Sequence, residues 1–159
     1  MLPGDPGAMR QTGPRRSSGG CARTAAVRRD EAGSGMSPLR DCVLVVDDEV
    51  LISELWCMIL EDMQIDVCAT ATTAAGAIAL AREHRPGLVL MDVRLDGPSD
   101  GVDAALAIQQ SVGSKIIFIT GSRDEPTLDR VKAARAARVL FKPLASRELQ
   151  EAVAAVLNA

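Results

Sequence analysis

Polar side chains with complementary chemistry follow the four strongest apolar runs of the chain. The first run leads into Asp47-Asp48-Glu49, and the later runs lead into Asp92, Thr120 and Lys142. Carboxylates that lie close together repel one another, since like charges about 4 Å apart cost on the order of 4 kcal/mol at an effective dielectric of 20. Lys142 and a hard divalent cation with oxygen ligands, Mg²⁺ or Mn²⁺, would compensate for that repulsion.

Such a group of side chains suits phosphoryl transfer onto a carboxylate. The metal and Lys142 would neutralise charge on the moving group, Thr120 would offer a hydroxyl donor, and Asp92 would attack. The acyl phosphate formed would carry roughly two negative charges and new acceptor oxygens. These would draw Thr120 and Lys142 toward Asp92, so that the chemistry and a switch are one event.

Short apolar runs and helical patterns alternate between residue 42 and the last residue, and they predict the elements that position these groups. Strands are expected at residues 42–46, 65–69, 88–91, 116–119 and 139–141. Helices are expected near residues 51–59, 74–83, 102–108, 128–136 and 146–157. Ser146 is the predicted N-cap of the last helix. In the first helix, apolar residues repeat at the i, i+4, i+7, i+8 spacing of one buried face, at Leu51, Leu55, Met58 and Ile59.

The alternation predicts an α/β fold, a five-stranded doubly wound parallel sheet, because parallel neighbours need crossover helices. The near-continuous apolar runs are typical of strands buried on both faces. Ligands of such sheets bind outside the carboxyl ends of the strands. The polar residues above are therefore expected to converge at one edge.

Several motifs in order resemble the receiver domain of two-component response regulators, in its single-domain, chemotaxis-regulator-like form. They are Val45–Glu49, Leu88–Leu95, Asp100-Gly101, Ile119–Gly121 and Phe141–Pro143. The resemblance covers nearly all of residues 41 to 159. It implies the (βα)₅ flavodoxin-like fold, with residues 40–159 as the receiver domain.

The resemblance implies that Asp92 is the phosphoacceptor and that Thr120 and Lys142 contact the phosphoryl group. The donor would be a phosphohistidine on a sensor histidine kinase or a histidine phosphotransfer protein. The chain would catalyse only its own phosphorylation and dephosphorylation. It would signal by contact with an unknown downstream protein, or act as a phosphate relay or sink, because one helix only follows Lys142.

The resemblance also implies the metal ligands. Mg²⁺ would be held directly by Asp48, Asp92 and the backbone carbonyl of Arg94, and mainly through water by Asp47. The peptide bond between Lys142 and Pro143 is expected to be cis, a conformation that proline makes accessible at a small energetic cost.

Two positions depart from the family pattern. Val139 stands where the family usually carries an aromatic switch residue, so the output would depend on Thr120 and its loop, or leave by another face. Arg94 would reach or screen the phosphoryl group, or it would be a solvated side chain that contributes only its carbonyl.

Two other functions remain as alternatives. One is a docking module that keeps the fold but does not depend on phosphorylation. The other is a Mg²⁺-dependent phosphatase with an aspartyl nucleophile, a family that typically needs a second aspartate at the position of Arg94.

Residues 1–39 are predicted to form a disordered basic leader without hydrophobic periodicity. It is either an arginine-rich arm for anionic surfaces or translated upstream sequence, with Met36 as the true start.

The aromatic fraction of 2% argues against base stacking on nucleic acid. No apolar run reaches the roughly 18 residues of a membrane span, so we expect a cytoplasmic protein. The cysteines form no CxxC pair and are expected to be inert thiols.

Overall fold

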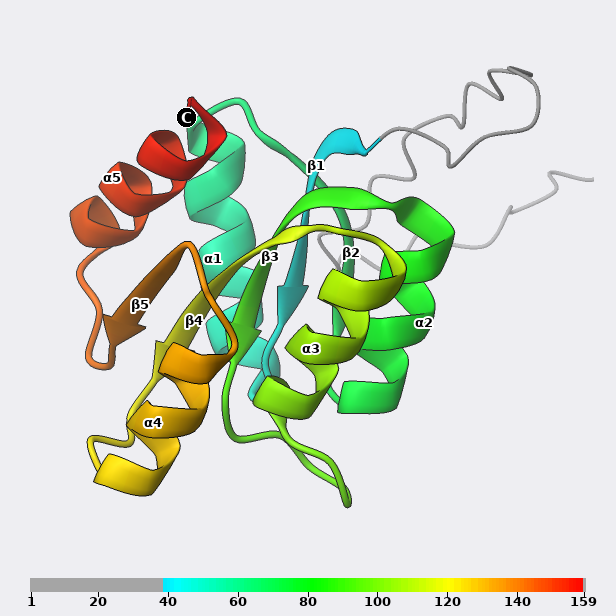
Figure 1. Ribbon diagram of the computed structural model, residues 1–159. Coiled ribbons are helices and arrows are strands. Elements are labelled where there is room, and N and C mark those ends of the chain that lie inside the picture. Colours follow the sequence, from blue (N-terminus) through cyan, green and yellow to red (C-terminus); the bar gives the residue numbers. More distant parts are fainter. Residues whose placement is uncertain (1–38, 159) are drawn as a thin grey trace, which may run out of the picture.

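One parallel sheet of five strands organises the computed structural model, which describes residues 39–158 (Figure 1). The strands are β1 (Arg40–Val46), β2 (Asp66–Ala71), β3 (Pro86–Asp92), β4 (Lys115–Thr120) and β5 (Arg138–Phe141). Their order across the sheet is β2-β1-β3-β4-β5, and each neighbouring pair is parallel. The predicted fold class is confirmed. The predicted leader lies, apart from Leu39, outside the described residues.

Helices cover both faces of the sheet, as crossover connections between parallel strands require. They are α1 (Val50–Asp62), α2 (Ala74–His84), α3 (Gly101–Ser111), α4 (Glu125–Ala133) and α5 (Ser146–Leu157). Buried residues of α2, α3 and α4 form one hydrophobic cluster, and those of α1 and α5 form a second cluster on the other face. No helix in the described part of the chain is long and apolar enough to cross a membrane.

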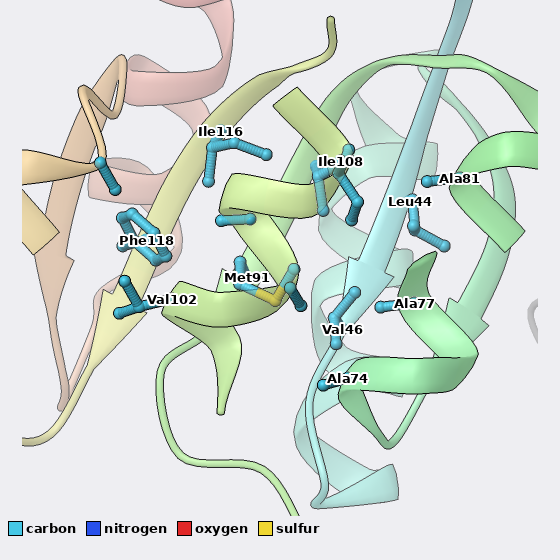
Figure 2. Close-up of a cluster of buried hydrophobic side chains, with 14 of the residues drawn as sticks. Leu44, Val46, Ala74, Ala77, Ala81, Met91, Val102, Ile108, Ile116 and Phe118 are labelled. Atoms are coloured by element: carbon cyan, nitrogen blue, oxygen red, sulfur yellow. The ribbon is translucent and has the colours of Figure 1, made fainter. Parts of the chain in front are cut away.

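The first cluster shows how the central strands are packed (Figure 2). Leu44 and Val46 of β1 point toward α2, whereas Val43 and Val45 point to the opposite cluster, because side chains alternate along a strand. The helix facing them carries only small buried residues, Ala74, Ala77 and Ala81. Helix α2 can therefore lie close to β1, whose end leads into the acidic motif.

The first residue of α4 and the cap of α5 differ from the sequence prediction. Helix α4 begins at Glu125 rather than near residue 128, because the Asp124 side chain caps it by accepting the Thr127 N–H at 3.1 Å. Helix α5 begins at Ser146 itself, so Ala145 occupies the N-cap position and the predicted Ser146 cap is wrong.

Of the four residues whose apolar spacing predicted the buried face of helix α1, only Ile59 is buried. Its buried residues are Ser53, Trp56, Cys57, Ile59 and Leu60. Leu51 is 79% exposed and Met58 is 62% exposed, and Val50 and Leu55 are also exposed. The helix is apolar on most sides, so periodicity alone does not select the face that meets the sheet. We call Val50, Leu51, Leu55 and Met58 the α1 apolar patch.

Candidate functional site

The carboxyl ends of the two central strands bring the predicted acidic residues together. Val46 at the end of β1 lies opposite Met91 of β3, so Asp47 and Asp92 follow side by side. Carboxylate oxygens of Asp47, Asp48 and Asp92 all lie within 4.8 Å of one another. The parallel register thus brings the adjacent pair Asp47-Asp48 and the distant Asp92 into one acidic cluster.

Lys142 joins this cluster from the end of β5. Its Nζ lies 3.2 Å from an Oδ2 atom of both Asp47 and Asp92. Its backbone N–H donates to the Thr120 carbonyl at 2.9 Å, which extends the pairing of β5 with β4. The ammonium also lies 5.6 Å from the centre of the Trp56 ring on α1. One cation is therefore shared by two buried carboxylates, beside the pairing of β5 with β4 and the Trp56 ring of α1.

The ionisation of these groups reflects their burial and their mutual charges. Burial and the neighbouring Asp47 carboxylate raise the pKa of Asp92 to about 6, against the opposing effect of Lys142. Burial likewise raises the pKa of Asp47, although the Glu49 N–H and Lys142 favour its charged form. Desolvation would lower the pKa of Lys142, but the charges of Asp92 and Asp47 outweigh it and raise that pKa.

The donor set fits a hard divalent cation. Three carboxylates face one ammonium, so the cluster carries excess negative charge, and Mg²⁺ prefers oxygen ligands of this kind. Backbone N–H groups already orient two of the carboxylates: Asp47 Oδ1 accepts from Glu49 at 2.8 Å, and Asp92 Oδ1 accepts from Arg94 at 3.3 Å.

Thr120 lies at the same edge, at the end of β4. It is buried, and its Oγ1 accepts the N–H of Ser122 at 3.0 Å. The predicted hydroxyl group is therefore present at the edge, where it holds the first turn of the loop that leads to α4. The Lys142–Pro143 peptide bond beside it is cis.

Comparison with known proteins identifies the family. The model of the response regulator receiver domain matches residues 43–154. The chain belongs to this family. Receivers of two-component systems are phosphorylated by histidine kinases or phosphotransfer proteins and bind Mg²⁺ through acidic residues. The structure of this receiver has a cluster of three aspartates.

Curated relatives of the receiver are regulators that it matches over about half of their length. The transcriptional regulatory protein PdtaR of Mycobacterium tuberculosis is 31% identical over 111 residues, which are 70% of this chain and 54% of that protein. The DNA-binding response regulator MtrA of Mycobacterium bovis is 30% identical over 123 residues, or 77% of this chain and 53% of that protein. The chain thus spans about half the length of these relatives.

Solved structures agree with the receiver fold. The signal receiver domain of a modulated diguanylate cyclase from Desulfovibrio desulfuricans G20 gives a TM-score of 0.69 at 31% identity, covering 73% of this chain and 92% of that one. A CheY-like receiver domain protein from Methanospirillum hungatei JF-1 gives a TM-score of 0.69 at 26% identity, and the match covers 76% of this chain and 95% of that one.

Two contacts around β5 involve Val139, the residue at the predicted switch position, and Phe141. Val139 is half-buried and packs against the first hydrophobic cluster, in register with Phe118. Two residues later, the Phe141 ring lies 4.5 Å below the guanidinium carbon of Arg123, which is in the loop before α4. Sequence reasoning missed this pair and the packing of Trp56 beside Lys142, because no spacing rule connects these residues.

A shallow cavity of about 430 Å³ adjoins this edge of the receiver. It is lined by Arg94, Gly121, Ser122, Arg123 and Asp124. Two arginines therefore border the space next to the residues that follow Asp92 and Thr120. With Asp124 also in the lining, the cavity is bordered by two positive side chains and one negative side chain.

Proposed function

We propose that this receiver accepts a phosphoryl group on Asp92 in a Mg²⁺-dependent reaction. The observation that supports this most is the shared ammonium of Lys142, 3.2 Å from both Asp92 and Asp47 in a cluster of three carboxylates. An aspartate that is buried, next to another acid and contacted by a movable cation can be a nucleophile whose product charge is compensated.

The proposed reaction uses the side chains as follows. A carboxylate oxygen of Asp92 attacks the phosphorus of a phosphohistidine, the P–N bond breaks, and the electron pair stays on the imidazole nitrogen, which takes up a proton. Lys142 shifts from the carboxylates to the phosphoryl oxygens. Thr120 releases the Ser122 N–H and donates its hydroxyl proton to the same group.

Mg²⁺ would be held by Asp48, Asp92 and the Arg94 carbonyl, with Asp47 bound through water. When bound, the ion neutralises charge on the transferred group. Mn²⁺ suits the same oxygen ligands. The phosphorylated receiver would then pass the group on or contact a downstream protein.

Intact mass after incubation with acetyl phosphate and Mg²⁺ tests the proposal. Wild type is expected to gain one phosphoryl group, and Asp92→Asn none, because an amide is not a nucleophile here. Asp96→Asn, at an exposed aspartate in the loop after β3, is the matched control and keeps the adduct. Excess EDTA should abolish it in wild type.

Other outcomes point to the alternatives. A wild type without adduct supports a docking module that works without phosphorylation. Continuous hydrolysis of added phosphate esters supports a phosphatase. An adduct that persists in Asp92→Asn contradicts the assignment of the acceptor.

We propose further that the phosphodonor protein docks on the α1 apolar patch. The patch begins at Val50, three residues after Asp47, so a partner that covers it brings its own reactive group to the acidic edge. Exposed apolar side chains gathered on one helix are typical of protein contact sites.

Leu51→Asp is therefore expected to slow phosphotransfer from a kinase that phosphorylates wild type by at least tenfold. Phosphorylation by acetyl phosphate should stay within about twofold, since the small donor needs no docking. Leu106→Asp, at an exposed leucine of α3, is the control. Equal loss with both donors would mean that the substitution damages the site itself and would contradict docking at α1.

A further inference from the structure

Two cysteine thiols on neighbouring strands lie against each other at the end of the sheet away from Asp92. Cys42 is close to the start of β1, and Cys68 belongs to the edge strand β2. Their side chains are near enough for each thiol to alter the pKa of the other. Cys57, by contrast, is buried in the cluster on the opposite face. The sequence predicted inert thiols without a CxxC pair, and the structure brings two of them close together.

An irregularity in the ladder explains the pairing. Val43 of β1 lies opposite Val67, but Leu44 lies opposite Ala69, so β2 has one extra residue at Cys68. Val67 faces the α1 and α5 cluster, whereas Ala69 faces the other cluster. This change of face within two residues requires a bulge. The bulge turns Cys68 toward the face on which Cys42, two residues before Leu44, also lies.

The surroundings favour oxidation of this pair. The Cys68 side chain lowers the pKa of Cys42, and the charge of Arg40 adds to this effect against burial and the charges of Asp66 and Asp41. A thiolate is the nucleophilic form of cysteine. Cys68 is half-buried in the edge strand, so a small oxidant can reach the pair. Cys42 lies opposite Asp66 in the ladder, so a link to Cys68 would run diagonally between the two strands at the bulge.

We propose that Cys42 and Cys68 form a reversible intramolecular disulfide when the receiver meets a peroxide. The Cys42 thiolate attacks the peroxide, the O–O bond breaks, and a sulfenic acid forms with release of hydroxide. The Cys68 sulfur then displaces the second hydroxide, and its thiol proton leaves with it. In total two thiols lose two electrons and two protons, and one hydrogen peroxide becomes two waters. A dithiol reductant restores both thiols.

The proposed link lies at the amino ends of β1 and β2, whereas the acidic cluster follows their carboxyl ends. Oxidation should therefore leave phosphorylation by acetyl phosphate within about twofold. The modification is independent of the role proposed for Asp92, so either proposal can fail without the other.

Mass spectrometry of the full chain tests the proposal. The reduced protein has four cysteines and should take four N-ethylmaleimide groups after unfolding. After brief treatment of the folded protein with hydrogen peroxide, it should take two, at Cys21 and Cys57, and a digest should contain a peptide in which Cys42 is joined to Cys68. Dithiothreitol should restore all four sites.

Variants sharpen this test. Cys57→Ala should still lose two alkylation sites on oxidation, whereas Cys42→Ala and Cys68→Ala should form no internal disulfide. The linked peptide is read from wild type, so the result does not depend on how well the variants fold. A disulfide that involves Cys21 or Cys57, or over-oxidation of Cys68 while Cys42 stays free for alkylation, would overturn the proposal.

Discussion

Gly101→Ala should destabilise the receiver by about 2–4 kcal/mol and lower its urea midpoint by roughly 1–2 M. A Cβ atom at this position would lie 1.9 Å from the Asp92 carbonyl oxygen, 2.9 Å from its carbonyl carbon and 3.0 Å from Val93 Cα. All three are backbone atoms, so no side-chain rotation relieves the overlap. The start of α3 must instead move away from the end of β3.

That movement would also break local contacts. The Gly101 N–H donates to the Val93 carbonyl at 2.8 Å, and Asp100 caps α3 by accepting the Asp103 N–H at 3.0 Å. The acceptor strand and the helix after it are thus fitted to a residue without a side chain. We therefore expect slower phosphorylation by acetyl phosphate even under conditions where the variant remains folded.

Gly121→Ala is the matched control for this prediction. Gly121 lies in the loop after Thr120, at the same edge, and nothing lies within 4 Å of a Cβ built there. Its unfolding free energy should stay within about 1 kcal/mol of wild type, and a small gain is possible because alanine restricts the unfolded chain. Equal urea midpoints for Gly101→Ala and Gly121→Ala would contradict the prediction, because they would mean that α3 can move away from β3 without loss of stability.

The fold and the clustering of the acidic groups could be predicted from the apolar runs and from the polar residues that follow them. Strands buried on both faces appear as apolar runs, and parallel strands place their carboxyl ends at one edge. The positions of Asp47, Asp92 and Lys142 therefore follow from three strand ends. The roles proposed for them still depend on the phosphorylation test.

Features that depend on tertiary packing could not be predicted from the sequence. Helix α1 presents apolar residues on several sides, and only packing against the sheet selects Trp56 and Leu60 over Leu51 and Met58. The bulge at Cys68 and the contact of Arg123 with Phe141 depend on strand register and side-chain conformation. Residue spacing along the chain predicts neither the strand register nor the side-chain conformation.

Lys142→Met should slow phosphorylation by acetyl phosphate by about a hundredfold or more, because one charged donor to the developing phosphoryl charge is lost. The same variant should bind Mg²⁺ several-fold more tightly, since the lost ammonium contacts Asp47 and Asp92 and repels a divalent ion held by the same carboxylates. Calorimetric titration with Mg²⁺ at pH 8, well above the pKa of about 6 of Asp92 in wild type, measures the second effect.

The opposite signs of these two effects separate a role in transfer from a role in assembling the site. A lysine that merely held the carboxylates in place would, on removal, weaken Mg²⁺ binding and phosphorylation together. Lys132→Met, which removes a charge from an exposed position on α4, should change neither quantity by more than about twofold. Weaker Mg²⁺ binding in Lys142→Met would therefore assign the lysine to the architecture of the acidic cluster, and the phosphoryl charge would then have to be neutralised by the metal and the arginines of the adjoining cavity.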